Sequence, residues 1–376
     1  MNIANIKDCY GCGVCAASCP KKIISIQLNK DGFYEPKIYK LADCVNCGIC
    51  IDVCAFEHNE ISSPNFPIKS WAAWSKDPNI RSKCSSGGVS FEIGKYLIDN
   101  GYLAVGCRYN IENHRAEHFI SSTAEEFEQS IGSKYIQSYT EKAFKEIKKD
   151  NKSYVIIGTP CQIDSIRRMI RRFHCESNFV LIDFFCHSVP SMWVWNSYLN
   201  LLKQEVGIIK NVSWRNKLFG WHDSYSMLVK GDKSEFISCR SKGDLFYKYF
   251  LGDLCTAPQC QKKCKYKYNK SSADLRIGDF WGKTYKKNKL GVSSLIAFTE
   301  KGLKVAENLD NLSIKEYPFE TVAEGQMRKN VRKKSMRSFI LFCLRHSIQI
   351  NHPILCFLSS IQNCTDRFVK FIFRII

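Results

Sequence analysis

Short apolar runs and turn signals dominate the first sixty residues, and longer helical and strand-like patterns follow. Residues 23–28 and 33–38 are apolar-rich runs on either side of Asp31-Gly32, a pair that favours tight turns, so they predict a β-hairpin. Residues 59–70 contain several serines and prolines, which indicates a boundary. The pattern therefore predicts a small N-terminal domain and a larger second domain.

The larger domain alternates helical and strand periodicities. We expect helices at residues 88–99, 124–129, 141–149 and 162–172. We expect strands at residues 103–108, 117–120, 153–157 and 179–184. The last two strands are predominantly apolar runs, as in a sheet that is covered on both faces, and a helix lies between them. This order predicts parallel neighbours in an α/β sheet.

The C-terminal segment combines apolar runs with a strong positive charge. Residues 328–376 contain ten lysines and arginines and one acid, Asp366. An amphipathic helix that lies on an anionic membrane has this pattern. A terminal helix that packs on the large domain, with a solvated basic face, would have it as well.

The twenty cysteines include two runs with the same spacing, C-x2-C-x2-C-x3-C. The runs are Cys9, Cys12, Cys15 and Cys19, followed by Pro20, and Cys44, Cys47, Cys50 and Cys54, followed by Ala55. This is the spacing of bacterial ferredoxins with two 4Fe-4S clusters, in which the fourth cysteine of each run binds the other cluster. We therefore assign Cys9, Cys12, Cys15 and Cys54 to one cluster, and Cys44, Cys47, Cys50 and Cys19 to the other. Gly11, Gly13 and Gly48 are expected where a side chain would strike a cluster.

Structural zinc and disulfide bonds are the alternatives for these cysteines. Zinc would need one tetrahedral set of four with a wider separation between its pairs. The first eight residues do not resemble a signal peptide, and no stretch reaches the roughly 18 apolar residues of a membrane span. We therefore expect a cytoplasmic protein with reduced thiols, in which cysteine clusters bind metal.

The chain is strongly basic, with a formal net charge of +19, and stays basic after the negative charge of the clusters is counted. This balance suits an anionic cofactor, an acidic partner such as a ferredoxin, or the inner face of an anionic membrane. A nucleic-acid partner is not expected, because no basic stripe with interleaved aromatic residues follows a known motif.

Four further cysteines come from three places in the large domain. Cys161 follows the strand at 153–157 and Cys186 follows the strand at 179–184, so both are expected at the carboxyl edge of a parallel sheet, where ligands bind. Cys260 and Cys264 lie in one short segment. These four could bind a third cluster, with Cys255 as a substitute for one of the pair, or they could be ordinary buried thiols.

Two segments could bind an anion, although the chain has neither G-x-G-x-x-G nor a P-loop. Ser85-Ser86-Gly87-Gly88 opens a predicted helix, whose amide groups and dipole attract anions; plain N-capping by a serine explains it equally well. Gly132-Ser133-Lys134-Tyr135 combines a flexible turn with a cation.

Together with these segments, several others resemble a known family. They are Gly158-Thr159-Pro160-Cys161-Gln162, Cys186-His187-Ser188-Val189-Pro190-Ser191, Trp214-Arg215-Asn216-Lys217, Gly220-Trp221 and the segment from Ser272 to Gly282. In this order they resemble the beta subunits of coenzyme F420-reducing hydrogenase and their relatives, here fused to a dicluster ferredoxin.

The resemblance implies an FAD-binding domain with its own 4Fe-4S cluster and an oxidoreductase activity. The implied ligands of the third cluster are Cys161, Cys186, Cys260 and Cys264, although the last pair is more widely spaced here than is usual in the family. The implied flavin-site residues are Ser86, Gly87, Gly88, Ser133, Lys134, Tyr135, Thr159 and Asp279. His187 could donate a proton or only hydrogen-bond a cluster sulfur, and Lys134 could bind flavin phosphates or stabilise reduced flavin.

The predicted fold is therefore mixed, α+β and α/β. We expect a dicluster ferredoxin domain at residues 1–60, a linker at 61–85, an FAD-binding α/β domain at 86–320 and a basic helical tail at 321–376. The predicted enzyme takes electrons from ferredoxin or a similar donor and reduces an organic hydride acceptor, either coenzyme F420 or a biosynthetic intermediate such as one in surface polysaccharide synthesis. The alternative is a non-catalytic electron-transfer subunit.

Overall fold

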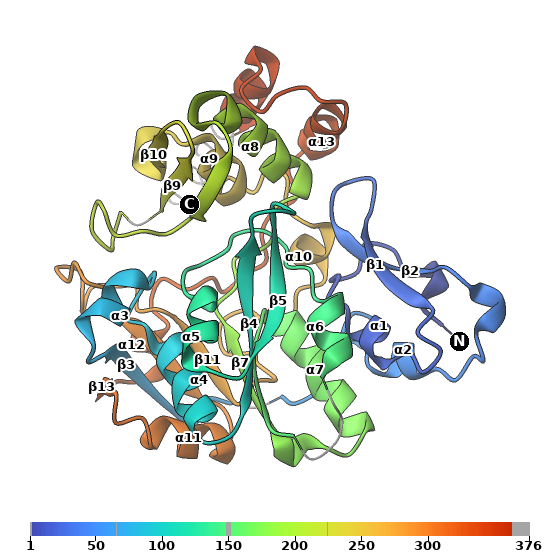
Figure 1. Cartoon of the computed structure of the whole chain (residues 1–376), viewed down its shortest axis with the longest axis vertical. Helices are drawn as coiled ribbons and strands as arrows, with labels where there is room; N and C mark the ends of the chain where they lie inside the picture. The colour runs from blue at the N-terminus through green and yellow to red at the C-terminus, as the bar shows by residue number, and fades with distance from the viewer. Residues whose placement is uncertain (1, 65, 148–151, 224, 363–376) are drawn as a thin grey trace, which may run out of the picture.

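The computed structural model describes residues 2–64, 66–147, 152–223 and 225–362. The N-terminal module contains the antiparallel hairpin β1 (Ile24–Leu28) and β2 (Tyr34–Ile38), as predicted, with Leu28 opposite Tyr34. Two short helices, α1 (Val14–Ser18) and α2 (Ile49–Asp52), follow the first cysteines of the two runs. In Figure 1 the module projects from one side of the large domain.

Eight of the described strands form one mixed sheet, in the order β13-β3-β12-β11-β7-β6-β4-β5. They are β13 (Leu312–Glu316), β3 (Lys69–Ser75), β12 (Ser293–Ala297), β11 (Leu275–Asp279), β7 (Phe179–Phe184), β6 (Tyr154–Ile157), β4 (Leu103–Asn110) and β5 (Arg115–Ser121). The central strands β11, β7, β6 and β4 are parallel, and the outer pairs are antiparallel. The predicted parallel pairing of β6 with β7 is confirmed.

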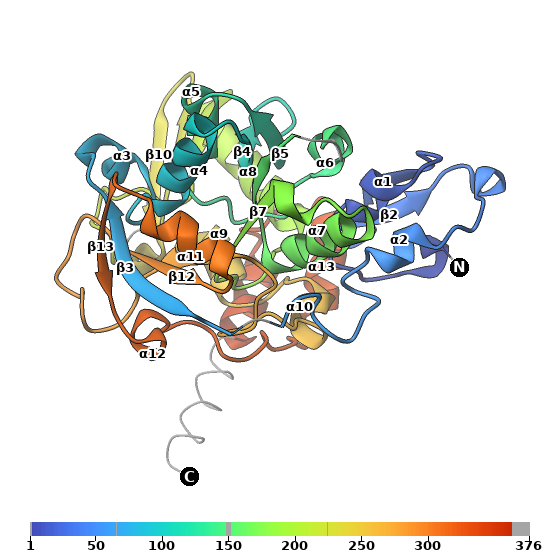
Figure 2. The ribbon, with the colours of Figure 1, turned by 90° about the horizontal axis from the view of Figure 1, so that it is seen from below.

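Helices cover both faces of this sheet, which explains why β6 and β7 are mostly apolar; the exception, Asp183 in β7, is buried and pairs with Arg276. In β6, Val155 and Ile157 pack with the apolar face of α4 (Val89–Asp99), whereas Tyr154 and Ile156 pack with α7 (Pro160–Arg172) on the other face. Figure 2 shows these layers from below. The remaining helices of this domain are α3 (Pro78–Lys83), α5 (Ala124–Phe127), α6 (Glu141–Glu146), α11 (Glu300–Glu307) and α12 (Phe319–Val322).

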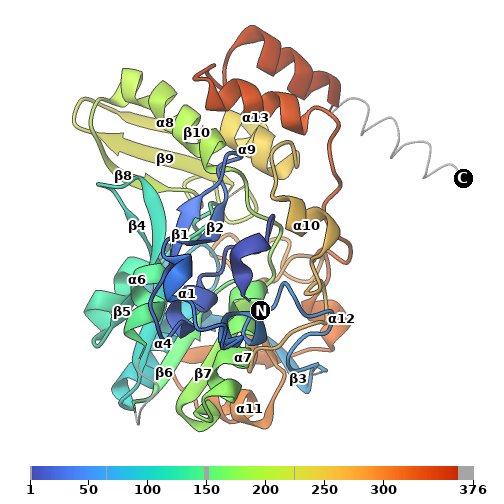
Figure 3. The same ribbon diagram turned by 90° about the vertical axis from the view of Figure 1, so that its right-hand side faces the viewer.

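A second layer lies above the carboxyl edge of the parallel strands (Figures 1 and 3). It is an antiparallel sheet of β8 (Ile209–Ser213), β9 (Ser226–Gly231) and β10 (Glu235–Cys239), packed with α8 (Met192–Val206), α9 (Leu245–Leu251), α10 (Pro258–Lys262) and α13 (Arg337–Arg345). Its core is rich in aromatic side chains, including the fully buried Trp195 and Trp214. The sequence patterns did not predict this layer.

Two predicted segments differ from the structure. The expected linker at 61–85 contains α3 and β3. β3 is an interior strand: it pairs with β12 on one side and with β13 on the other, and most of its side chains are buried. In the expected tail, α13 packs against α8 through Ile340, Leu341 and Leu344, and a further helical stretch covers 353–362. The end of the predicted tail, 363–376, and the end of the helix expected at 141–149 lie outside the described residues.

Candidate cofactor sites

The first predicted ligand set lies around one small cavity of the N-terminal module. Cys9, Cys12, Cys15 and Cys54 all line it, although Cys54 comes from the second run. Burial, and to a smaller extent the neighbouring Cys12 thiol, raises the pKa of the Cys54 thiol to about 12. Four adjacent buried sulfurs can be thiolates together only next to a strong positive charge, which the irons of a cluster supply. The donor set therefore fits a 4Fe-4S cluster.

The second predicted set lies around a neighbouring cavity. Cys19, Cys44, Cys47 and Cys50 line it, so the structure exchanges the fourth cysteines between the runs in the way that the spacing predicts. Within the described residues, no group of three or more histidine, cysteine or acidic side chains is placed to hold a single metal ion. The assignment of these eight cysteines as cluster ligands stays a prediction.

The glycines of the cysteine loops line the two cysteine cavities, and their predicted role beside a cluster stays a prediction. Gly11, Gly13 and Gly48 have φ values of 63°, 78° and 78°, a left-handed region that suits glycine. A Cβ atom on Gly11 would strike the carbonyl oxygen of Tyr34, and one on Gly13 would strike Thr140 Oγ1. These two glycines therefore allow close packing of backbone against neighbouring segments, and the described structure gives no contact that a Cβ on Gly48 would meet.

The third predicted set gathers at the carboxyl edge of the parallel strands. Cys161 lies in the first turn of α7 after β6, Cys186 follows β7, and Cys260 lies on α10; all three line one large cavity. Cys264 influences the pKa values of Cys186 and Cys260, so it is close to both. Burial raises the pKa of Cys186 to about 11.

Cys255 does not join this group. It is fully buried in the core of the second layer, and the charged side chains that influence its thiol are Arg337 and Asp31. The wide C-x3-C pair, Cys260 and Cys264, is therefore the pair that the structure brings to Cys161 and Cys186.

The first and third sets meet at the junction between the module and the large domain. Cys12 Sγ lies 3.3 Å from Ser165 Oγ, and Ser165 is one helical turn after Cys161 on α7. Beside them, the Tyr10 ring packs edge-on against Phe56, and its hydroxyl donates to the carbonyl oxygen of Lys263. One helix and one tyrosine thus separate the two cysteine sets.

The predicted flavin segments line the same large cavity, which encloses about 470 Å³. The predicted residues among its walls are Ser86, Gly88, Ser133, Lys134, Tyr135, Thr159 and Asp279, together with Cys161, Cys186, Cys260 and His187. A pocket of this size is ordinary for an organic ligand. Gly87 is buried beneath this wall, and its amide donates to Ser293 Oγ at 2.9 Å.

The N-terminus of α4 opens into this cavity. Its N-cap is Gly88, with φ 92°, and no side chain caps the helix, so plain serine capping does not explain the segment. The hydroxyl of Ser86 instead donates to the carbonyl oxygen of Val292, and Ser85 Oγ accepts from the amide of Ser133. These bonds join the two predicted anion segments beside exposed helix amides, an arrangement that fits a phosphate group.

The side chain of Lys134 is bound to backbone carbonyl groups and does not extend freely into the cavity. Its ammonium group donates to the carbonyl oxygens of Gln129, Ser130 and Ile131, at 3.3, 2.8 and 2.9 Å. Burial lowers the pKa of Lys134 to about 8. Its three protons are thus occupied, and it offers the cavity positive charge rather than a hydrogen bond.

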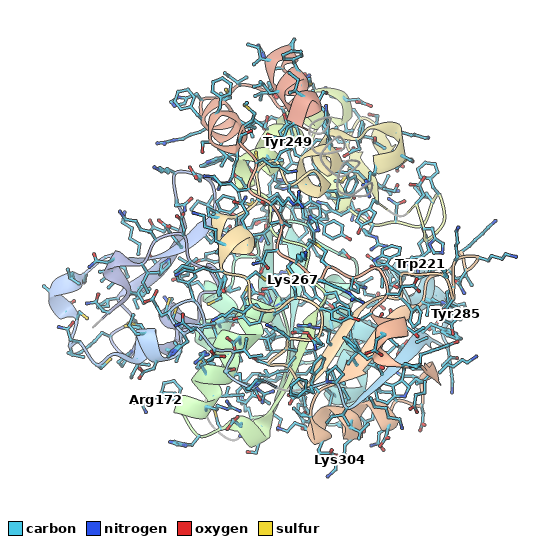
Figure 4. All side chains as sticks on the ribbon, turned by 180° about the vertical axis from the view of Figure 1, so that it is seen from behind. Arg172, Trp221, Tyr249, Lys267, Tyr285 and Lys304 are labelled. Carbon is cyan, nitrogen blue, oxygen red and sulfur yellow. The ribbon has the colours of Figure 1, made fainter. Side chains whose placement is uncertain are left out.

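Asp279 forms an ion pair with a buried arginine, Arg215, which the sequence did not single out as a site residue. Arg215 donates to its two carboxylate oxygens at 2.6 and 3.1 Å, and Trp221 Nε1 donates at 2.9 Å. The carboxylate raises the pKa of Arg215 against the effect of burial. The segments Trp214-Arg215-Asn216-Lys217 and Gly220-Trp221 were the signal for these residues. Trp221 lies at the edge of the large domain in Figure 4.

His187 pairs with an acid at the cavity wall. Its Nε2 lies 2.7 Å from Asp253 Oδ1, and its ring packs edge-on against Phe250. Lys267, which the sequence did not single out, donates to the carbonyl oxygens of Cys186 and His187 at 2.7 and 2.6 Å. Lys267 lies at the centre of the molecule in Figure 4, between the two layers.

Known proteins match three stretches of the chain. Residues 8–58 match the 4Fe-4S dicluster domain, residues 70–145 the N-terminal part of the coenzyme F420 hydrogenase/dehydrogenase beta subunit, and residues 151–320 its C-terminal part. The chain is 30% identical over 191 residues to one of the subunits of the F(420)H(2) dehydrogenase of Methanosarcina mazei, a match that covers 47% of this chain and 53% of the relative. The chain thus spans about half the length of this curated relative.

A solved structure of the F420-reducing NiFe hydrogenase complex from Methanosarcina barkeri contains a similar chain. The sequence identity is 14% and the TM-score is 0.46, over 77% of this chain and 91% of that chain.

Proposed function

Because the chain belongs to the family of coenzyme F420 hydrogenase/dehydrogenase beta subunits and carries an N-terminal 4Fe-4S dicluster domain, we propose that it is an iron–sulfur flavoprotein oxidoreductase. In this proposal, the module would accept electrons from reduced ferredoxin or a similar donor, a third 4Fe-4S cluster and FAD would be held in the large domain, and an organic hydride acceptor would receive the electrons.

One observation carries the proposal: the third cysteine set and the predicted flavin segments share the walls of one cavity. Cys161 and Cys186 line it together with Ser133 and the N-terminus of α4. Cys12 of the first set contacts Ser165, which lies one turn of α7 after Cys161 of the third set. The cysteine sets and the cavity therefore form one continuous series in space, in the order second set, first set, third set and cavity.

FAD, when bound, would supply the conversion between single electrons from the clusters and a hydride for the acceptor. The residues that would hold it are the amides at the start of α4 and the Ser133 segment, next to the positive charge of Lys134. Asp279 and Trp281 line the cavity, and the buried Arg215 binds Asp279 and lies 5.2 Å from the centroid of the Trp281 ring, so it would hold this wall rigid. His187, oriented by Asp253, would hold a proton near the third cluster.

The proposed acceptor is coenzyme F420 or a biosynthetic intermediate, including one in surface polysaccharide synthesis. The curated relative is named as a subunit of a dehydrogenase. This name favours, as a second candidate, an electron-transfer subunit that serves a partner enzyme. Turnover of a small acceptor by the isolated chain separates the two functions, because a pure carrier would give none.

The direct experiment is anaerobic purification with quantification of iron, sulfide and flavin. Three clusters require about twelve iron atoms per chain, with equal sulfide and one FAD. Addition of reduced ferredoxin should then bleach the flavin absorbance. Bound zinc without acid-labile sulfide, or clusters without flavin, would contradict the proposal.

We also propose that the basic C-terminal tail contacts the surface of an anionic membrane. Phe339 and Phe342 are 49% and 59% exposed on α13, and Phe357 is 65% exposed on the next helical stretch. Exposed phenylalanines among lysines and arginines are typical of helices that lie in a lipid interface. Within the part of the chain that the structure describes, no helix is long and apolar enough to cross a bilayer.

A further inference from the structure

The two cysteine sets of the N-terminal module differ in their access to solvent. Cys9, Cys12 and Cys15 of the first set are 7–9% exposed, whereas Cys47 of the second set is an exposed residue. The first set faces the large domain through Ser165 on α7. The second set therefore lies at the outer end of the series, on the module that projects from the large domain in Figures 1 and 2.

Exposed apolar side chains surround this outer set. Tyr39, Leu41 and Val45 are 54%, 57% and 58% exposed, and they lie within seven residues of one another on the segment that leads to Cys44 and Cys47. Val45 also lines the cavity of the second cysteine set. Isolated exposed apolar residues are common, but a group of three beside a redox site is typical of a contact surface.

Four exposed lysines, Lys21, Lys22, Lys37 and Lys40, accompany this apolar group. Lys21 lines the same cavity as Cys47, and the Tyr39 hydroxyl donates to the carbonyl oxygen of Lys22 at 2.5 Å, which joins the two segments. None of the four ammonium groups has an ion-pair partner among the described residues. The single acid of residues 37–47 is Asp43.

We propose that Tyr39, Leu41 and Val45, with Lys21, Lys22, Lys37 and Lys40 around them, form the docking surface for a small acidic one-electron carrier protein. This inference rests on the proposed function and adds the place where the donor binds. The unpaired lysines attract the acidic carrier and raise its association rate, while the small apolar centre allows brief contact and fast release. Interfaces of transient redox pairs are small, below about 1,200 Å².

The number of electrons in a hydride determines how many carrier molecules must dock at this surface. Each carrier molecule would lose one electron, and the cluster that Cys19, Cys44, Cys47 and Cys50 would hold would accept it. Two carriers must therefore dock in succession for every hydride, which consists of two electrons and one proton from the solvent. A surface that releases each oxidised carrier quickly suits this sequence.

The experiment follows the reduction of the clusters in the holoprotein by an acidic 4Fe-4S ferredoxin, using stopped-flow absorbance. We expect the second-order rate constant to fall at least about tenfold between about 20 mM and about 300 mM salt. The double variant Lys21→Glu with Lys40→Glu should show a similar loss at low salt. The matched control is Lys304→Glu, an exposed lysine on α11, which lies at the bottom of the large domain and away from the N-terminal module in Figure 4; its rate should stay within about twofold.

Two further measurements keep docking separate from electron transfer to the flavin. Calorimetric titration with oxidised ferredoxin should show weaker binding to the double variant and to Leu41→Ser. Dithionite, a small reductant that needs no docking surface, should reduce the clusters of every variant at the wild-type rate. If the flavin stays oxidised while the clusters are reduced normally, the proposed function fails and the docking surface stands. Equal ferredoxin rates and affinities in the double variant and in Lys304→Glu would overturn the docking surface, as would preferential binding of a basic carrier.

Discussion

Cys12 Sγ lies 3.3 Å from Ser165 Oγ, and this contact joins the N-terminal module to α7. Ser165 is fully buried, and its hydroxyl also accepts a hydrogen bond from the amide of Ala55 at 3.2 Å. A hydroxyl at this place can donate to a ligating sulfur and thereby stabilise its negative charge. One side chain thus connects both cysteine runs to the helix that carries Cys161.

Replacement of this serine should weaken the junction. In Ser165→Ala the buried amide of Ala55 loses its partner, so we expect the free energy of unfolding to fall by about 1–3 kcal/mol. The potential of the adjacent cluster should become more negative, because one hydrogen bond to its sulfurs is lost. Denaturant titration and an EPR-monitored redox titration measure the two effects. The exposed Ser177→Ala is the control, and an unchanged potential in Ser165→Ala would contradict the assigned contact.

The ligand sets predict which cysteines hold iron. Cys15→Ala, Cys47→Ala and Cys186→Ala should each lose about four iron atoms per chain, one cluster at a time. Cys255→Ala should keep the full iron content, because Cys255 lies beside Arg337 and Asp31. Iron and sulfide analysis of anaerobically purified variants gives the answer. Loss of iron in Cys255→Ala, with retention in Cys186→Ala, would reverse the third assignment.

The buried pair of Arg215 and Asp279 supplies a stability prediction. Arg215 is 1% exposed and its charge is balanced by Asp279, so Asp279→Asn leaves a buried cation without compensation. We expect a loss of about 3 kcal/mol in the free energy of unfolding and weaker retention of FAD. Denaturation and flavin release measure these losses, with the exposed Asp310→Asn as the control. Normal stability of Asp279→Asn would show that the pair has no structural role.

Lys134 predicts a dependence of stability on alkaline pH. Burial lowers its pKa in the folded protein to about 8, whereas the unfolded chain has the ordinary value of about 10.4. Between these values the unfolded state binds more protons, so stability increases as the pH rises through this window. From pH 7 to pH 10, wild type should gain about 2 kcal/mol relative to Lys134→Met. Denaturant titrations at both pH values provide the comparison, and a constant difference would exclude a depressed pKa.

The exposed phenylalanines of the tail predict lipid binding. The triple variant Phe339→Ser, Phe342→Ser and Phe357→Ser should float less with liposomes that contain anionic lipid, while neutral liposomes should bind neither protein. Leu218→Ser, which removes another exposed apolar side chain (59%), is the control and should float like wild type. Equal flotation of the triple variant and wild type would end the membrane proposal.

Several features of the chain could be predicted from short segments of sequence. The cysteine spacing implied two ligand sets with exchanged fourth members, and the structure groups Cys54 with the first run and Cys19 with the second. The hairpin, α4, α7 and the parallel strands β6 and β7 also followed from local patterns. Local spacing succeeds in these cases because neighbouring residues fix their own backbone geometry and facing directions.

Other features depend on contacts between distant segments. The partners of Arg215 and Cys12 could not be read from periodicity, because each side chain meets residues from another element or another domain. The position of β3 inside the sheet depends in the same way on β12 and β13. The sequence by itself determined the cysteine loops, the α/β alternation and the family. Only the tertiary structure decided which buried groups face each other, because burial and charge compensation arise when distant elements pack together.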